Sequence, residues 1–174
     1  MIRSDVKFSV DPDLTAKGLK VRVATFSVTD IPRRRGSGLE NHIKEVVASL
    51  NIEDLLKSPI LEAYKTLQRE AGIKEPAAPA EYLLKLIQRS GMLPNINRVV
   101  DCYNIASAET LLSMGAHDLS KIKGNVHLRT TDGAEKYTPL GKSELEKVAP
   151  GEYAAIDEEK ILCRLDLKQC DETK

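Results

Sequence analysis

Two hydrophobic periods divide this chain of 174 residues into three parts. Near both ends, apolar and polar side chains alternate, the pattern of half-buried strands. In the middle, apolar side chains recur every three or four residues, the period of a helix. The alternating segments are 6–10, 19–28, 126–130, 152–156 and 161–167. Strands, then three or four helices, then strands predict an α+β fold with mostly antiparallel pairing, rather than a doubly wound α/β sheet.

The middle of the chain also carries the signals that begin and end helices. Ser58 is a plausible N-cap with Pro59 at the first helical position, and Gly72 and Gly91 can end helices. We expect helices from about 39 to 50, 59 to 71, 80 to 90 and 96 to 112. The apolar stripe of the first expected helix consists of Leu39, Ile43, Val46, Val47 and Leu50.

The charge balance limits what the chain can bind. It has 26 basic and 26 acidic residues, so its formal net charge is zero. Bulk affinity for nucleic-acid phosphates needs an excess of Lys and Arg. RNA contact would therefore need a local basic patch or a pocket for a terminal nucleotide. We expect no DNA partner, and the sequence leaves the oligomeric state open.

Targeting and metal signals are missing from the sequence. It has no run of about 18 apolar residues and hence no expected membrane partner or span. Residues 1–5 have no apolar stretch after their positive charge, unlike a signal peptide. The three cysteines are odd in number and form no CxxC, so we expect free thiols and a cytoplasmic setting. No metal site and no cofactor are predicted.

One polar stripe stands out in the fourth expected helix. Asn97, Asp101 and Asn104 are spaced i, i+4 and i+7, which places them on one helical face. Such a stripe can bind a ribose, an amino group or another ligand. It can equally satisfy buried backbone groups of neighbouring loops. The spacing leaves both interpretations open.

Two further segments carry charge in a suggestive order. Arg33, Arg34 and Arg35 precede a Gly-Ser-Gly and could contact RNA phosphates, although most such runs are solvated loops. His117 stands beside Asp118, and a histidine next to a carboxylate could act as a general base. Adjacent loop residues rarely face each other, so a surface or helix-capping role is the alternative. The catalytic residue stays unknown, with His117 as the candidate.

From Leu93 onward the sequence resembles the tRNA-editing (B3/B4) domain of the phenylalanyl-tRNA synthetase beta subunit. The resemblance rests on an ordered series: INRVVDCYN at 96–104, MGAHDL at 114–119 and KIKGNVHLR at 121–129. It is clear over about 58–174 and weak before that. It implies the editing-domain fold, related to a module of tRNA-lysidine synthetase, in which mixed sheets form an unusual β-sandwich with flanking helices.

The resemblance also implies a substrate pocket. Asn104 matches a pocket asparagine of the family, and Tyr103 replaces a smaller hydroxyl residue. The family's pocket histidine falls on Gly115, which has no side chain to position a water. Leu165 and Asp166 fall near small residues that shape the amino-acid pocket. Together with Asn97 and Asp101, these residues are the predicted substrate-binding set.

The function implied is that of a free-standing relative which binds tRNA or aminoacyl-tRNA and hydrolyses a mischarged ester in trans. Because of Gly115, enzymatic activity is left open. The alternatives are a non-catalytic module for RNA, a nucleotide or an amino-acid derivative, and an interaction domain for a translation factor. We expect a single domain over 1–174, divided into 1–57 and the module-like 58–174. The family's module extends further by a strand or two, so the chain is expected to be naturally short or truncated.

Overall fold

The computed structural model describes residues 6–28 and 30–174, so the expectation about a signal peptide at residues 1–5 lies outside the described residues. Contacts group the chain into two compact units. Unit 1 comprises Met1–Ser27, Leu67–Glu75 and Ala116–Lys174. Unit 2 comprises Val28–Thr66 and Pro76–Gly115. These boundaries differ from the division expected near residue 57, and the single-domain organisation stays a prediction.

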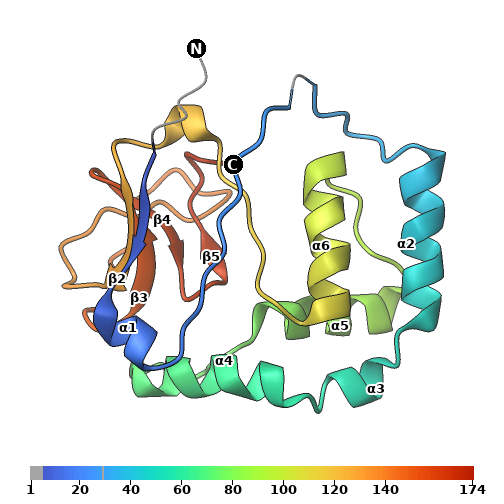
Figure 1. Ribbon diagram of the computed structural model, residues 1–174, viewed down its shortest axis with the longest axis horizontal. Helices are drawn as coiled ribbons and strands as arrows, with labels where there is room; N and C mark the ends of the chain where they lie inside the picture. The colour runs from blue at the N-terminus through green and yellow to red at the C-terminus, as the bar shows by residue number, and fades with distance from the viewer. Residues whose placement is uncertain (1–5, 29) are drawn as a thin grey trace. The chain divides into compact units, whose positions relative to one another are not determined.

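Unit 1 is built on one five-stranded sheet (Figure 1). Its strands, in both chain and spatial order, are β1 (Phe8–Val10), β2 (Val126–Thr130), β3 (Tyr153–Ile156), β4 (Ile161–Arg164) and β5 (Lys168–Gln169). β1 pairs parallel to β2, and the other neighbours are antiparallel. The α+β class, strands 126–130 and the hairpin across 157–160 are therefore confirmed. The implied β-sandwich is not, since the described strands form a single open sheet.

Two apolar clusters pack around this sheet. One cluster centres on Leu128, Tyr153 and Leu165 and includes Leu14 from α1 (Pro12–Ala16). The other centres on β3 and β4 and is completed by Tyr137 and Val148 from the long connection between β2 and β3. Consecutive residues of β3 and β4 are buried or half-buried, so both faces of these two strands are covered.

Unit 2 is helical. Its helices are α2 (Ser37–Ser49), α3 (Ile52–Leu55), the first part of α4 (Pro59–Glu70), α5 (Pro79–Ser90) and α6 (Arg98–Thr110). α6 packs against α2 and α5 (Figure 1). The core of the unit includes Ile43, Leu61, Leu84, Ile87 and Ile105. The apolar stripe predicted for the first helix, from Leu39 to Leu50, faces this core and is confirmed.

The helix signals read from the sequence are confirmed as well. The Ser58 hydroxyl accepts a hydrogen bond from the Ile60 amide at 3.3 Å, as an N-cap does. Gly91 ends α5 in the left-handed region with φ of 71°. The short helix α3 was not predicted, because four residues are too few to show a helical period.

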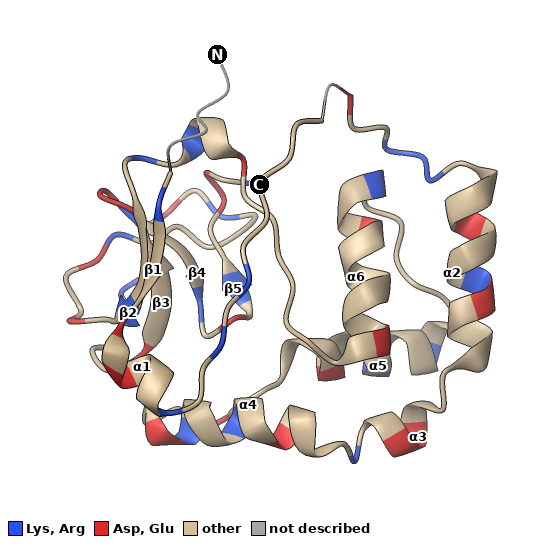
Figure 2. Ribbon diagram, in the orientation of Figure 1, with Lys and Arg blue, Asp and Glu red and all other residues tan. Residues whose placement is uncertain are grey.

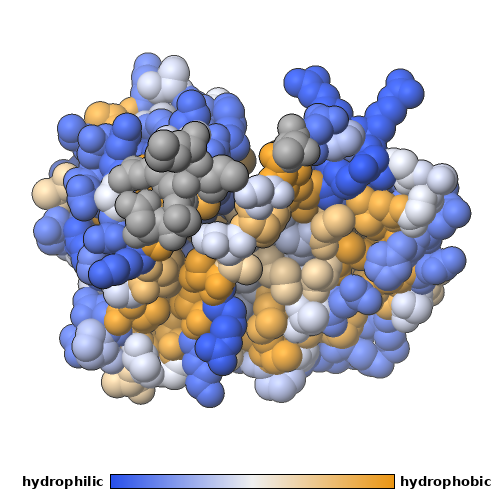
Figure 3. Space-filling view, turned by 45° about the horizontal axis from the view of Figure 1, so that its top comes forward, coloured by the Kyte–Doolittle hydropathy of each residue, from blue (hydrophilic) through white to orange (hydrophobic). Residues whose placement is uncertain are grey.

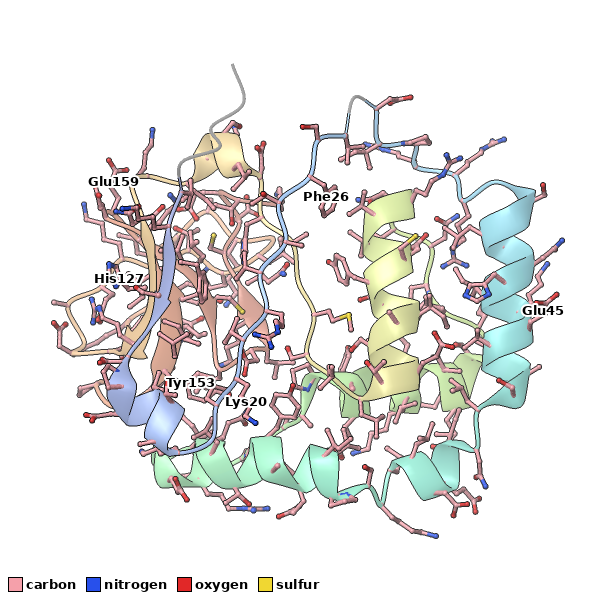
Figure 4. All side chains as sticks on the ribbon, in the orientation of Figure 1. Lys20, Phe26, Glu45, His127, Tyr153 and Glu159 are labelled. Carbon is pink, nitrogen blue, oxygen red and sulfur yellow. The ribbon has the colours of Figure 1, made fainter. Side chains whose placement is uncertain are left out.

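The predicted strand at 19–28 was wrong. This segment has no regular secondary structure. Leu19 and Val21 pack on the apolar cluster of unit 1, whereas Val23 and Phe26 are 57% and 65% exposed (Phe26 is labelled in Figure 4). Alternation predicts a strand only where a neighbouring strand supplies hydrogen bonds. Among the described residues, β2 is the only strand that pairs with β1, and 19–28 joins no ladder.

None of the helices in the described residues has the length and apolar character needed to cross a membrane.

Candidate functional site

Two residues of the predicted polar stripe hold the start of α6 in place. Asn97 is not inside the helix but is its N-cap, and its side-chain oxygen accepts from the Val100 amide at 3.0 Å. Asp101 is completely buried. Its carboxylate accepts from the Ile96 amide at 3.0 Å and from Arg35 Nε at 2.8 Å. Both side chains thus satisfy backbone amides at the start of α6, as the second interpretation predicts, and the Asp101 carboxylate is enclosed.

The arginine run divides into one buried and two exposed residues. Arg35 is 7% exposed. Besides its ion pair with Asp101, it donates to the Leu93 carbonyl at 2.8 Å and to the Pro94 carbonyl. The prediction that Arg35 contacts RNA is therefore corrected, because its guanidinium is enclosed in protein. Arg33 and Arg34 are exposed, on the loop before α2 (Figure 2).

The remaining stripe residue keeps its polar side chain available. Asn104 is half-buried, and its side chain makes no hydrogen bond to a described residue. Tyr103, beside it, is also half-buried, and burial and the nearby Asp101 charge raise the pKa of its hydroxyl. Gly115 is exposed, in the irregular segment 111–118. Unit 2 therefore offers Tyr103 and Asn104 as its polar, accessible candidates.

In unit 1, the predicted residues Leu165 and Asp166 form a strained turn. They follow β4 with φ of 53° and 57°, the left-handed region, and neither is glycine. Such residues cost of order 1–3 kcal/mol each and often mark functional sites. The Leu165 amide donates to the Tyr153 carbonyl at 3.0 Å, and its carbonyl accepts from Gln68 Nε2 at 3.2 Å. These bonds hold the turn despite its strain.

Asp166 belongs to a buried cluster of titratable groups. Its carboxyl accepts a hydrogen bond from the Tyr153 hydroxyl at 3.0 Å (Tyr153 is labelled in Figure 4). Burial raises the pKa of Asp166, and the hydrogen bond from Tyr153 only partly opposes this. Burial, followed by the Asp166 charge, also raises the pKa values of Tyr153 and Cys163. The cluster therefore favours neutral, hydrogen-bonding forms, and Cys163 lacks the depressed pKa of a nucleophilic thiol.

His117 does not pair with the carboxylate next to it. Its Nδ1 lies 2.7 Å from the Thr173 hydroxyl, and burial lowers its pKa, so the imidazole is neutral at pH 7. Asp118 instead accepts from the Ser120 amide at 2.9 Å and caps the 3₁₀ helix at Leu119–Lys121. The helix-capping alternative is therefore confirmed for Asp118. His117 keeps only its Nε2 available for a substrate.

A polar pair that sequence reasoning missed lies on β1 and β2. Ser9 Oγ is 2.6 Å from His127 Nδ1, and both residues line a hollow of about 300 Å³ (His127 is labelled in Figure 4). No carboxylate of a described residue bonds the other nitrogen of His127, so the pair lacks the orienting group of a catalytic triad. The two residues are 118 positions apart, and only the strand register brings them together.

The polar stripe lines neither this hollow nor a second one in unit 2. The second hollow, about 500 Å³, lies in unit 2 along the connection from α2 through α3 to α4. Asn97, Asp101 and Asn104 line neither. In the part of the chain that the structure describes, no group of three His, Cys, Asp or Glu is placed to hold a metal ion.

Comparison with protein families decides the relationship. Residues 66–174, more than half of the chain, match the model of the B3/4 domain. The chain belongs to the B3/4 domain family. This domain is found in the beta subunit of phenylalanyl-tRNA synthetase, so the resemblance seen in the sequence is confirmed. Comparison with curated proteins gives no match.

The B3/4 match covers some of the candidate residues and not others. It begins within α4 and includes α5, α6 and strands β2 to β5. Tyr103, Asn104, Leu165 and Asp166 therefore lie inside the B3/4 region. The arginine run at 33–35 lies outside it, so its role must be argued from this chain alone.

Proposed function

We propose that this B3/4 protein binds tRNA in the cytoplasm, recognises the aminoacyl group esterified at the 3′ end, and hydrolyses that ester in trans when the amino acid is wrong. Family membership is the observation that carries the proposal, because the same domain is found in a subunit that handles aminoacyl-tRNA. The three free cysteines are in keeping with a reducing compartment.

Tyr103 and Asn104 of unit 2 are the proposed contacts for the terminal nucleotide or amino group. The side-chain amide of Asn104 has two N–H donors and an oxygen acceptor. It is half-buried and makes no hydrogen bond to a described residue. Neighbouring Asn97 and Asp101 fix the first turn of α6 and thereby the helix on which Asn104 sits. Removing Asn104 should weaken recognition without removing a contact that stabilises the fold.

Unit 1, taken by itself, offers an alternative recognition site, in which Asp166 and Tyr153 would test the amino-acid side chain. A site whose buried polar groups need hydrogen bonds discriminates strongly against a substrate that leaves them unpaired. Asp166 has a raised pKa and an established bond to Tyr153, so it is suited to hydrogen bonding rather than to ion pairing. The strained turn supports the idea that its position is functional.

Hydrolysis requires little beyond positioning. The oxygen of a water attacks the ester carbonyl carbon, the bond to the ribose oxygen breaks, and that oxygen leaves with a proton. An ester is already reactive, so orientation of the water and stabilisation of the oxyanion account for most of the help needed. In the unit 1 alternative, a neutral His117 would accept the water's proton at Nε2.

A second candidate is a binding module that does not hydrolyse. Gly115, where the family has its pocket histidine, favours it, and so does the Thr173 bond that occupies one nitrogen of His117. This candidate shares the recognition step and differs only in the outcome for the ester.

The decisive assay incubates the protein with a panel of mischarged tRNAs and follows loss of the ester. We expect faster loss for at least one mischarged tRNA. Asn104→Ala should lower the rate on the order of tenfold, as for loss of one positioned donor. Glu109→Ala is the matched control on the exposed side of α6 and should leave the rate unchanged.

Retention of charged tRNA without any ester loss would favour the binding module. If the protein shows no ester loss and also retains no tRNA at low salt, both candidates are refuted.

A further inference from the structure

We propose that Arg33, Arg34 and Arg98 form a phosphate-binding surface for the RNA backbone, here called the arginine patch, and that buried Arg35 positions it. The patch belongs wholly to unit 2. This inference rests on the proposed function, and it names the surface by which a chain of zero net charge gains affinity for tRNA.

The loop that carries Arg33 and Arg34 is fixed by buried contacts. Arg35 anchors it through Asp101 and through the carbonyls of Leu93 and Pro94. The next residue, Gly36, has φ of 76°, a conformation that other residues rarely adopt. The buried contacts of Arg35 therefore fix the loop, and the two arginines before it, Arg33 and Arg34, remain exposed at the surface.

The same contacts bring the loop to the beginning of α6. The Arg98 amide donates to the Pro32 carbonyl at 3.1 Å. A Cβ atom built on Gly36 would lie 3.3 Å from Arg98 Nη2, so the guanidinium of Arg98 passes close to the loop. Arg98 is the first residue of α6, where the helix dipole adds a modest positive potential. Residues 65 positions apart are thus gathered on one surface.

The three guanidinium groups of the patch are exposed and not neutralised. Arg33, Arg34 and Arg98 form no ion pair with a described residue. The two acidic groups that pair with Arg35 of the same loop are Asp101 and Glu40, and Glu40 also pairs with Lys44. Asp30, in the same loop, is the exposed acid that opposes the patch.

The figures show the same concentration of charge. Figure 2 places basic segments on the loop before α2 and at the first turn of α6. In Figure 3, long hydrophilic side chains project from the upper right of the molecule, where this loop lies. Exposed, planar guanidinium groups match phosphate oxygens in geometry as well as charge. The patch therefore fits a polyanion with regularly spaced phosphates.

The salt dependence of binding measures the patch directly. Three phosphate contacts predict a slope of log affinity against log salt of about −2 to −2.7, for single strands and duplex respectively. We would measure tRNA retention by filter binding from 50 to 200 mM KCl for the wild-type chain and for Arg33→Ala/Arg34→Ala/Arg98→Ala. The matched control is Arg89→Ala, which removes an exposed arginine from α5 of the same unit.

The triple variant should bind tRNA at least tenfold more weakly at 50 mM KCl, with a slope shallower by about two or more, while Arg89→Ala matches the wild type. An unchanged helical circular-dichroism signal would show that the variant is folded. If the triple variant retains both affinity and slope, the arginine patch is wrong while the proposed function stands. If the wild type binds no tRNA at any salt concentration, both proposals are refuted.

Discussion

The buried pair between Arg35 and Asp101 allows a sharp test of how unit 2 is held together. In Asp101→Ala, Arg35 keeps its side chain at 6% exposure but loses the carboxylate that faces its Nε. Removing one partner of a buried pair costs about 3–5 kcal/mol. Glu40 still contacts Arg35 at 3.3 Å, which places the loss near the lower end of that range. The Ile96 amide also loses its acceptor, which adds about 1 kcal/mol.

We therefore expect Asp101→Ala to lower the free energy of unfolding by about 3–4 kcal/mol. Urea unfolding followed by circular dichroism at 222 nm suits the measurement, because the longer helices provide most of that signal. With a slope of about 2 kcal/mol per molar urea, the midpoint should fall by about 1.5–2 M. Glu109→Ala, on the exposed side of α6, should stay within about 0.5 kcal/mol of the wild type.

A double-mutant cycle with Arg35→Met separates the pair from its surroundings. The sum of the stability losses in the two single variants should exceed the loss in the double variant by about 1–3 kcal/mol. Each single variant leaves a buried charge without its partner. A loss below about 1 kcal/mol in Asp101→Ala, or additive single effects, would refute the reasoning that this pair fastens the loop to α6.

Three further perturbations follow from the geometry. Asn97→Ala removes the N-cap of α6 and should cost about 1 kcal/mol in urea unfolding. Asp157→Ala should destabilise unit 1 at pH 7 by about 2–4 kcal/mol, because the carboxylate accepts from two backbone amides of its own turn and from the Lys123 amide. Burial acts to raise the pKa of Asp157, but its hydrogen bonds outweigh this and lower it, so its contribution should be present above pH of about 4 and be lost as pH falls through the lowered pKa. Asp166→Asn should stabilise the protein at pH 7, because the raised pKa of Asp166 means that folding opposes its charge. The gain in stability should shrink as pH falls and Asp166 becomes protonated. Thermal unfolding measured over a pH series tests this, and a gain that grows as pH falls would contradict it.

The sequence revealed the elements whose signals are local. The stripe from Leu39 to Leu50 and the Ser58-Pro59 start depend on neighbours within a turn or two, and both were predicted. The segment 19–28 was mispredicted because alternation does not reveal whether a partner strand exists. The contact between Ser9 and His127 depends on the register of two strands far apart in the chain, which no local pattern encodes.

The candidate site shows the same division. Spacing placed Asp101 and Asn104 on one face of α6, yet their roles differ because Arg35, 66 residues before Asp101, folds onto only one of them. From the sequence alone, Arg33, Arg34 and Arg35 were likewise predicted to be three equivalent exposed cations. The burial of Arg35 could not be inferred from the run, since its partner Asp101 lies far along the chain, on α6. The resemblance, by contrast, identified the family correctly because it used an ordered series of motifs.

The central claim is that this B3/4 protein recognises tRNA carrying an aminoacyl group. The most direct measurement compares its affinity for an uncharged tRNA and for the same tRNA bearing the amino acid through a non-hydrolysable amide. We predict tighter binding to the charged form, with the difference reduced in Asn104→Ala. Equal affinity for the two forms, or retention of neither, would contradict the account.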